Sequence, residues 1–229
     1  MALTASLEAA WPALALSLTV AGWACLITLI LGSGVGLLLA RCRFPGRELL
    51  DTLLTLPMVL PPTVLGYYLL VALGRRGWLG GWLQETFGIH LIFTWQGAVI
   101  AASAVTFPLV FKPARAAFES VDWQLEQASR GLGLPEWAVF FRVTLPLAWR
   151  GILAGLLLAF ARAMGEFGAT LMVAGNIPGE TQTLSVAVYE AVQAGQDQTA
   201  TFLAVLTSIV CLVVLLAASR LNPARRESA

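Results

Sequence analysis

The stretch VDWQLEQASRGLGLPEWAVFFRVTLP, residues 121–146, is the polar centre of an otherwise apolar chain. It is too polar to cross a membrane, yet its residues follow a pattern. Asp122 is a suitable N-cap for a short helix that runs to Arg130, because its side-chain oxygen can accept a hydrogen bond from the first turn. Gly131 or Gly133 can end that helix, since glycine readily adopts the left-handed conformation of a helix end. The pattern predicts a short helix followed by a glycine turn.

A second short helix is predicted to begin at Pro135, because proline suits the first turn of a helix. Its apolar face would carry the aromatic side chains of Trp137, Phe140 and Phe141. The chain then enters the next apolar run at Leu145–Pro146. A helix pair of this kind can dock into a groove on another protein, or it can rest on lipid; the residues alone leave both interpretations open.

The composition on either side of this loop is that of a protein embedded in a bilayer. Of the 229 residues, 58% are hydrophobic and 12% are charged, and the mean hydropathy is +0.79. Soluble domains carry about 25% charged residues. A helix needs about 20 apolar residues to cross a membrane, and five such spans are predicted, at residues 13–40, 52–74, 91–111, 147–175 and 198–219. The sequence therefore predicts an all-α, polytopic membrane protein with a single transmembrane domain over residues 1–229.

Basic residues are concentrated in alternate loops between the predicted spans. The loops after the first and third spans, together with the C-terminal segment, hold 11 of the 14 basic residues, whereas Arg75 and Arg76 lie on the opposite side. Because lysine and arginine are enriched in cytoplasmic loops, the N-terminus is predicted to lie on the outer side of the membrane. The C-terminus, with Arg220, Arg225 and Arg226, is predicted to be cytoplasmic.

Two shorter segments on the outer side are predicted to lie at the membrane surface. In residues 77–88, Trp78 and Trp82 suit the depth of the lipid headgroups. Residues 184–192 form the second of these segments.

Three prolines interrupt the second predicted span, at Pro57, Pro61 and Pro62. Each removes a backbone donor and clashes with the preceding turn, so a kink or an unwound segment is expected. Broken helices inside a membrane are tolerated where they line a cavity. Pro61 and Pro62 are therefore candidates for a translocation path, although simple bending of the helix explains them equally well.

Arg162 and Glu166 are charged residues within the fourth predicted span, four apart and so on one helix face. A charged side chain at the bilayer centre costs about 2.5–3.5 kcal/mol by insertion scales, and such groups need a partner or water. Two interpretations fit. The pair borders a translocation path in which Arg162 favours an oxyanion, or it is an ion pair that fixes helix packing.

The spacing within residues 127–146 resembles the cytoplasmic signature of binding-protein-dependent ABC importer permeases. That signature is Glu-Ala-Ala, three residues, Gly, nine residues, Ile, one residue and Leu-Pro. Here Ala128 matches the first Ala, Gly133 matches the Gly, and Leu145–Pro146 match the Leu-Pro.

The loop departs from the signature at three positions. Gln127 stands in place of the Glu, Ser129 in place of the second Ala, and Val143 in place of the Ile. Glu126 lies beside Gln127 and is the expected substitute for the missing carboxylate.

The resemblance extends over nearly the whole chain, and its finer features are similar to the molybdate branch of this family. They are RCRFPGRELLD at 41–51, LPMVLPPTVLGYYLL at 56–70, RAMGEFGAT at 162–170 and GNIPGETQTL at 175–184. Sulfate permeases share this architecture, so sulfate and tungstate remain alternative substrates.

The resemblance implies a type I ABC importer permease fold in the bacterial cytoplasmic (inner) membrane. It implies a homodimer, two ATP-binding subunits on the cytoplasmic side, and a periplasmic molybdate-binding protein, but no nucleic acid. The permease is expected to bind no cofactor or metal itself, because ATP and Mg are used by the partner ATPase. The loop is implied to be the coupling helix that contacts this ATPase, through Glu126, Gln127, Ala128, Gly133, Trp137, Phe140, Phe141, Val143 and Pro146.

Other classes of protein find little support in the residues. An intramembrane enzyme needs a nucleophile with a base, or a metal cluster, but the only histidine is His90. ATP hydrolysis by this chain is excluded, because its sole lysine, Lys112, is not part of a phosphate-binding loop. A stand-alone secondary transporter would be expected to show internal repeats and carboxylates in several spans. An assembly factor that transports nothing would leave Arg162 and Glu166 unexplained.

Overall fold

The computed structural model describes residues 2–221 and, among these, the side chains of residues 10–216. Every regular element in this range is a helix, so the predicted all-α class is confirmed. Arg225 and Arg226, which were used to predict a cytoplasmic C-terminus, lie outside the described residues. The elements are α1 (Ala2–Arg41), α2 (Arg47–Val59), α3 (Pro62–Leu73), α4 (Trp78–Phe87), α5 (Trp95–Glu119), α6 (Trp123–Gly131), α7 (Glu136–Val139), the π-helix η1 (Phe140–Thr144), α8 (Leu145–Met164), α9 (Gly168–Ala174), α10 (Leu184–Gln193) and α11 (Asp197–Leu221).

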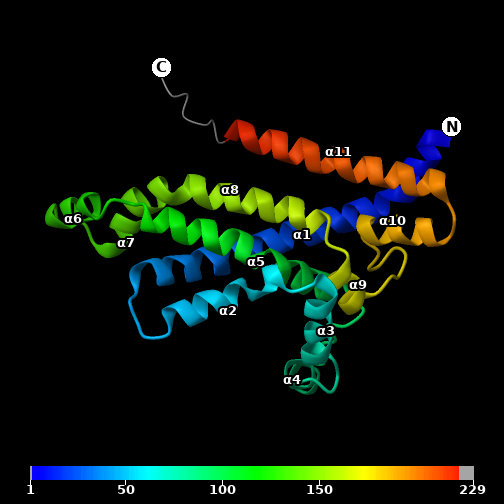
Figure 1. Cartoon of the computed structure of the whole chain (residues 1–229), viewed down its shortest axis with the longest axis horizontal. Coiled ribbons are helices and arrows are strands. Elements are labelled where there is room, and N and C mark those ends of the chain that lie inside the picture. Colours follow the sequence, from blue (N-terminus) through cyan, green and yellow to red (C-terminus); the bar gives the residue numbers. More distant parts are fainter. Residues whose placement is uncertain (1, 222–229) are drawn as a thin grey trace.

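Long helices that lie side by side form the body of the molecule (Figure 1). Among the described residues, four helical segments are long and apolar enough to cross a membrane: Ala10–Arg41, Trp95–Glu119, Glu136–Met164 and Asp197–Leu216. A fifth span results if α2 and α3 are counted as one bent pair. The predicted count of five therefore depends on this pair.

The second predicted span is broken where the prolines predicted a kink. Helices α2 and α3 meet at an angle of 111°. Pro57 is accommodated inside α2, but Leu60 and Pro61 are extended, with ψ of 141° and 135°. Each of these two residues precedes a proline, and the proline ring disfavours a helical conformation there. Pro62 then occupies the first turn of α3, where its missing N–H costs nothing.

The fourth predicted span, residues 147–175, differs from the structure at both ends. Helical backbone begins at Glu136 and runs without a break through α7 and η1 into α8, so the helical run starts before Leu145–Pro146. The N–H of Leu145 donates to the carbonyl of Phe140, which makes this turn wider than an α-turn. The wide turn gives room for the ring of Pro146, which would otherwise clash with the preceding turn. At the other end α8 stops at Met164, and α9 is a separate helix.

Helix α5 packs closely against both α1 and α8, which also contact each other, because small residues let the backbones approach closely. A Cβ atom built on Gly36 of α1 would lie 3.0 Å from the backbone nitrogen of Arg115. At the contact with α8, a Cβ atom on Gly155 would lie 2.7 Å from the carbonyl oxygen of Leu109. Two helices therefore contact α5 through glycines.

We expect Gly155→Ala to destabilise the bundle, because the added methyl group has no room beside the carbonyl of Leu109. Overpacking of this kind typically costs about 1–3 kcal/mol. The measurement is the midpoint of thermal unfolding in detergent, which should fall by several degrees. Gly34→Ala is the matched control, since no atom lies within 4 Å of its added methyl group. Equal midpoints for the two variants would contradict close packing at Gly155.

The two predicted surface segments differ in their surroundings. In α4, Trp78 and Trp82 are exposed, as expected for a helix at the headgroup level. In α10, however, Leu184 and Val186 are fully buried, and the helix packs against α1 and α11. Protein therefore covers part of the apolar face of this helix, and the position of residues 184–192 at the membrane surface stays a prediction.

Candidate functional site

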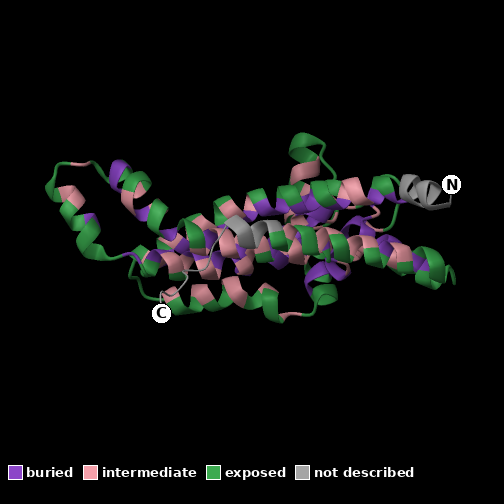
Figure 2. Ribbon diagram, turned by 90° about the horizontal axis from the view of Figure 1, so that it is seen from above, coloured by how far each residue is buried: buried purple, intermediate pink, exposed green. Residues whose placement is uncertain are grey.

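The polar loop predicted to carry the function projects beyond the end of the bundle, opposite the start of α1 (Figures 1 and 2). The predicted cap is present, since the side chain of Asp122 accepts a hydrogen bond of 2.8 Å from the backbone nitrogen of Gln124. Helix α6 ends at Gly131, but the left-handed residue of the turn is Gly133, with φ of +82°. The turn between the two short helices thus depends on Gly133.

The predicted aromatic face of the second short helix is divided in the structure. Pro135 is the N-cap of α7. Trp137 and Phe141 are exposed, at 66% and 60%. Phe140 instead packs inward, with its ring centre 6.4 Å from that of Phe118. The expectation that all three aromatic residues share an outward face is therefore wrong for Phe140.

Other members of the predicted site also differ in exposure. Gln127 and Ala128 lie on the exposed surface of α6, Val143 is half-buried in η1, and Pro146 is exposed in α8. Large apolar side chains are exposed beside them, including Leu132 at 84%. Exposed apolar groups at the end of a bundle are typical of a surface that binds another protein.

Glu126 does not belong to that exposed surface. Only 3% of the residue is accessible to solvent. Its carboxylate forms ion pairs with Arg41 and, at 3.8 Å, with Arg130, and it accepts a hydrogen bond of 2.6 Å from the hydroxyl of Thr144. Arg130 also donates to Glu136 at 2.6 Å, and this hydrogen bond raises the pKa of Arg130. The expectation that Glu126 offers its charge at the docking surface is therefore wrong, because the charge is used within the chain.

The charged pair of the fourth span lies at a break in that span. Arg162 is in the last turn of α8, and its Nη1 lies 2.7 Å from Oε2 of Glu166. Glu166 lies beyond the helix end, is 2% exposed, and accepts a hydrogen bond of 2.9 Å from the backbone nitrogen of Ala169. The pair predicted on one helix face therefore spans the break between α8 and α9.

The structure brings the two broken spans together. A Cβ atom on Gly168, at the start of α9, would lie 3.0 Å from the Cβ of Pro62. One turn further along, a Cβ atom on Gly66 of α3 would lie 2.9 Å from the Cα of Ala169. The proline break and the Glu166 break are thus neighbours, whereas the polar loop lies at the end of the bundle.

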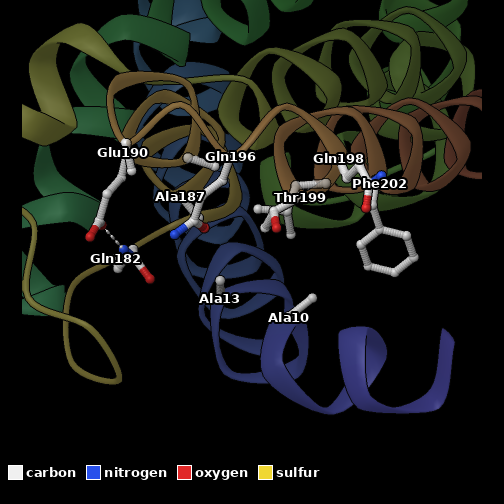
Figure 3. Close-up of a pocket in the computed structure, with 12 residues that line it drawn as sticks. Ala10, Ala13, Gln182, Ala187, Glu190, Gln196, Gln198, Thr199 and Phe202 are labelled. Carbon is white, nitrogen blue, oxygen red and sulfur yellow. Dashed lines mark hydrogen bonds between the residues drawn. The ribbon is translucent and has the colours of Figure 1, made fainter. Parts of the chain in front are cut away.

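A cavity of about 530 Å³ opens at the end of the molecule opposite the polar loop, between α1, α10 and α11 (Figure 3). It is lined by alanines, among them Ala13 and Ala187, and by polar side chains such as Gln196 and Thr199. Of the lining residues, Gln182 donates a hydrogen bond to Glu190, and Asn176, outside the lining, donates a second one of 2.8 Å to Glu190. Sequence reasoning missed this cavity, because its lining residues are far apart in the chain and follow no motif.

Comparison with known proteins identifies the family. Residues 32–227 match the family described as the inner membrane component of binding-protein-dependent transport systems. The chain belongs to this family. As a member, it is a multi-pass inner membrane protein and the permease component of an ABC importer, and it works with an ATPase and a binding protein.

The relatives of this permease include a molybdenum transport protein and a sulfate transport protein. The chain is 48% identical over 220 residues to the molybdenum transport system permease protein ModB of Escherichia coli (strain K12), with 96% of each chain covered. It is 40% identical over 177 residues to the sulfate transport system permease protein CysW of Synechocystis, with 77% of this chain and 64% of that protein covered.

A solved structure shares the fold of this permease. It is a crystal structure of a bacterial alginate ABC transporter in complex with a periplasmic protein that holds an alginate pentasaccharide. The match has a TM-score of 0.76 at 19% identity and covers 94% of this chain and 79% of that one. The type I ABC importer permease fold predicted from the loop is confirmed by this similarity.

Proposed function

We propose that this permease moves molybdate across the bacterial inner membrane as part of an ATP-driven importer. The observation that carries the proposal is the 48% identity, over 96% of the chain, with a molybdenum transport permease. The second candidate substrate is sulfate, which the 40% identity with a sulfate permease favours. Tungstate is the third, because its tetrahedral oxyanion resembles molybdate in shape and charge.

The permease acts as a homodimer, with residues 1–229 forming one transmembrane domain in each copy. Two ATP-binding subunits lie on the cytoplasmic side, and a periplasmic molybdate-binding protein lies on the other. The distribution of charge supports this orientation: Arg41, Arg115 and Arg130 lie towards the end that carries α6, whereas Glu190 and Asp197 lie at the end with the α10–α11 cavity (Figure 1). The N-terminus is then periplasmic and the C-terminus cytoplasmic.

The loop at residues 121–146 is the element that contacts the ATPase. Its exposed residues are suited to fill a groove on that partner, since an aromatic anchor surrounded by smaller contacts is typical of a docking site. Trp137 and Phe141 are the aromatic anchors, and Gln127, Ala128 and Gly133 lie on the exposed surface beside them. Phe140 and Val143 support this surface from within the chain, and Pro146 lies exposed in α8.

The translocation path passes the two broken spans, at Pro61 and Pro62 and at Arg162 and Glu166. Unwound backbone at membrane depth is tolerated where it lines a cavity. Arg162 is 37% exposed, so its guanidinium can reach a passing oxyanion while it stays paired with Glu166. The competing interpretation is that the pair serves packing alone, and the double variant Arg162→Gln with Glu166→Gln separates the two.

ATP drives the permease between two states. Binding of ATP closes the pair of ATPase subunits and moves the two docked loops together. The spans then turn from an inward-facing to an outward-facing arrangement, and hydrolysis resets them. The permease supplies the path and the docking surface, and the ATPase supplies the energy.

The proposal is tested by ATP-driven uptake into proteoliposomes that hold this chain with its ATPase and binding protein. Radiolabelled molybdate, tungstate and sulfate are compared at equal concentration. We expect molybdate to accumulate, with sulfate at least tenfold lower. Accumulation of sulfate alone would mean that sulfate, not molybdate, is the substrate. Uptake driven by an ion gradient without the ATPase would contradict an ATP-driven importer.

A further inference from the structure

Three elements distant in sequence meet at the carboxylate of Glu126. Arg41 is the last residue of α1, Glu126 is in the middle of α6, and Thr144 closes the π-turn before α8. Oε1 of Glu126 accepts hydrogen bonds from the guanidinium of Arg41 and from the hydroxyl of Thr144. Oε2 forms an ion pair with Arg130 at 3.8 Å. The whole carboxylate is thus surrounded by donors of the same chain.

A buried carboxylate with several partners stabilises one arrangement of the elements that supply those partners. Taking a charge out of water carries a large desolvation penalty, which only close, well-placed partners offset. Thr144 is 4% exposed and Glu126 is 3% exposed, so both groups of the hydrogen bond are buried. Such a fully satisfied polar cluster rigidifies its surroundings and specifies one arrangement.

The position of the cluster makes Glu126 the link between the loop and the first span. Helix α6 packs on α7 and η1, and it projects beyond the bundle (Figure 2). Arg41 reaches Glu126 from α1, which is the helix most extensively packed against the central helix α5. Arg41 is also placed at the C-terminus of α1, where a cation is favoured by the helix dipole.

We propose that Glu126 is a positioning residue that joins the loop to α1, so that α6 and the cytoplasmic end of α1 move as one body when the ATPase subunits close. The inference rests on the proposed coupling role of the loop. Motion of the docked loop then reaches α1 directly through Arg41, and it reaches α8 through Thr144. The π-turn serves this arrangement, since it places the Thr144 hydroxyl against Glu126 while the helix continues into α8.

The first test measures whether the two elements move together. Spin labels are placed on Cys42, which is exposed beside Arg41, and on Ala128→Cys, with Cys25 and Cys211 replaced by alanine. The complete complex is studied with and without ATP under conditions that block hydrolysis. We expect the distance between the labels to be the same in both states. In Glu126→Gln we expect the distance distribution to broaden and to change with ATP.

The second test measures coupling in proteoliposomes. Glu126→Gln and Arg41→Gln should each lower oxyanion uptake per ATP hydrolysed about tenfold. The double variant should be no worse than either single one, because residues that act as a pair are not additive. Thr144→Val keeps both charges and should have a smaller effect. Arg43→Gln is the matched control, since Arg43 is exposed and forms no ion pair among the described side chains, and it should retain full coupling.

Two results would overturn the inference. One is a change in the Cys42–Ala128→Cys distance between the two states of the otherwise unaltered protein, which would mean that loop and α1 move independently. The other is an unchanged uptake-to-hydrolysis ratio in both Glu126→Gln and Arg41→Gln. Failure of the proposed function has a different signature, because the permease with an intact Glu126 would then show no ATP-driven oxyanion uptake at all.

Discussion

Replacing Gly133 with Asp is expected to reduce ATP-driven uptake by at least about a hundredfold while the permease still inserts and folds. Gly133 has φ of +82°, a left-handed conformation that aspartate adopts more readily than most L-residues, so the turn itself can be kept. The new carboxylate would be placed on the surface that we propose docks into the ATPase, where an unpaired buried charge costs about 2–5 kcal/mol. Since 1.4 kcal/mol corresponds to a factor of ten, a cost of about 3 kcal/mol already gives a hundredfold loss. Uptake and binding of the purified ATPase are measured in parallel.

Two control variants separate the causes of this loss. Gly133→Asn adds a neutral side chain of similar size, and asparagine tolerates the left-handed conformation, so it should keep most of the uptake. Gly131→Asp adds the same charge two residues earlier, where φ is not positive and no atom lies within 4 Å of the new Cβ. It should have an intermediate effect. Normal uptake by Gly133→Asp would exclude this turn from the contact with the ATPase.

Replacing Arg162 with Gln is expected to lower uptake about a hundredfold and to lower ATP hydrolysis much less. The guanidinium is the positive group that an oxyanion would meet at the break between α8 and α9. Its loss also leaves the carboxylate of Glu166, which is 2% exposed, without its ion pair. Breaking a buried pair from one side typically costs about 3–5 kcal/mol. Uptake and hydrolysis are compared on the same reconstituted complex.

The double variant Arg162→Gln with Glu166→Gln separates a path from mere packing. It removes both charges, while a neutral glutamine at position 166 can still accept the hydrogen bond from the backbone of Ala169. If the pair only fixes the packing, uptake should return to near the level of the unaltered permease. The path interpretation requires uptake to stay low, because no positive group remains for the oxyanion. Equal loss of uptake and hydrolysis in Arg162→Gln would also count against the path.

Much of the helix pattern follows from local rules. The cap at Asp122, the turn at Gly133 and the break before Pro62 each depend on a few neighbouring residues, and the structure has all three. The end of the fourth span could not be predicted this way. Residues 147–175 are almost continuously apolar, and apolar composition does not distinguish one long helix from two helices with a break at Glu166.

The candidate sites were predictable only in part, because local patterns do not show which distant residues meet. The spacing of Ala128, Gly133 and Pro146 located the loop and its family without any knowledge of the fold. It did not show that Phe140 points inward against Phe118. It also did not show that residues 140–144 form a π-turn rather than an α-turn. The contact between Pro62 and Gly168 joins segments about a hundred residues apart and leaves no local pattern.

Hydropathy, charge distribution and motif spacing are properties of neighbouring residues, so they were enough to predict a helical inner-membrane permease with a polar loop of the family's spacing. What each polar group does depends on how the helices pack. Glu126 looked like a surface charge, but the packing of α6 against η1, with the end of α1 beside them, buries it and supplies Arg41 and Thr144 as partners. The role of a charge depends on the groups that surround it in space, and residues 41, 126 and 144 become neighbours only when the helices pack.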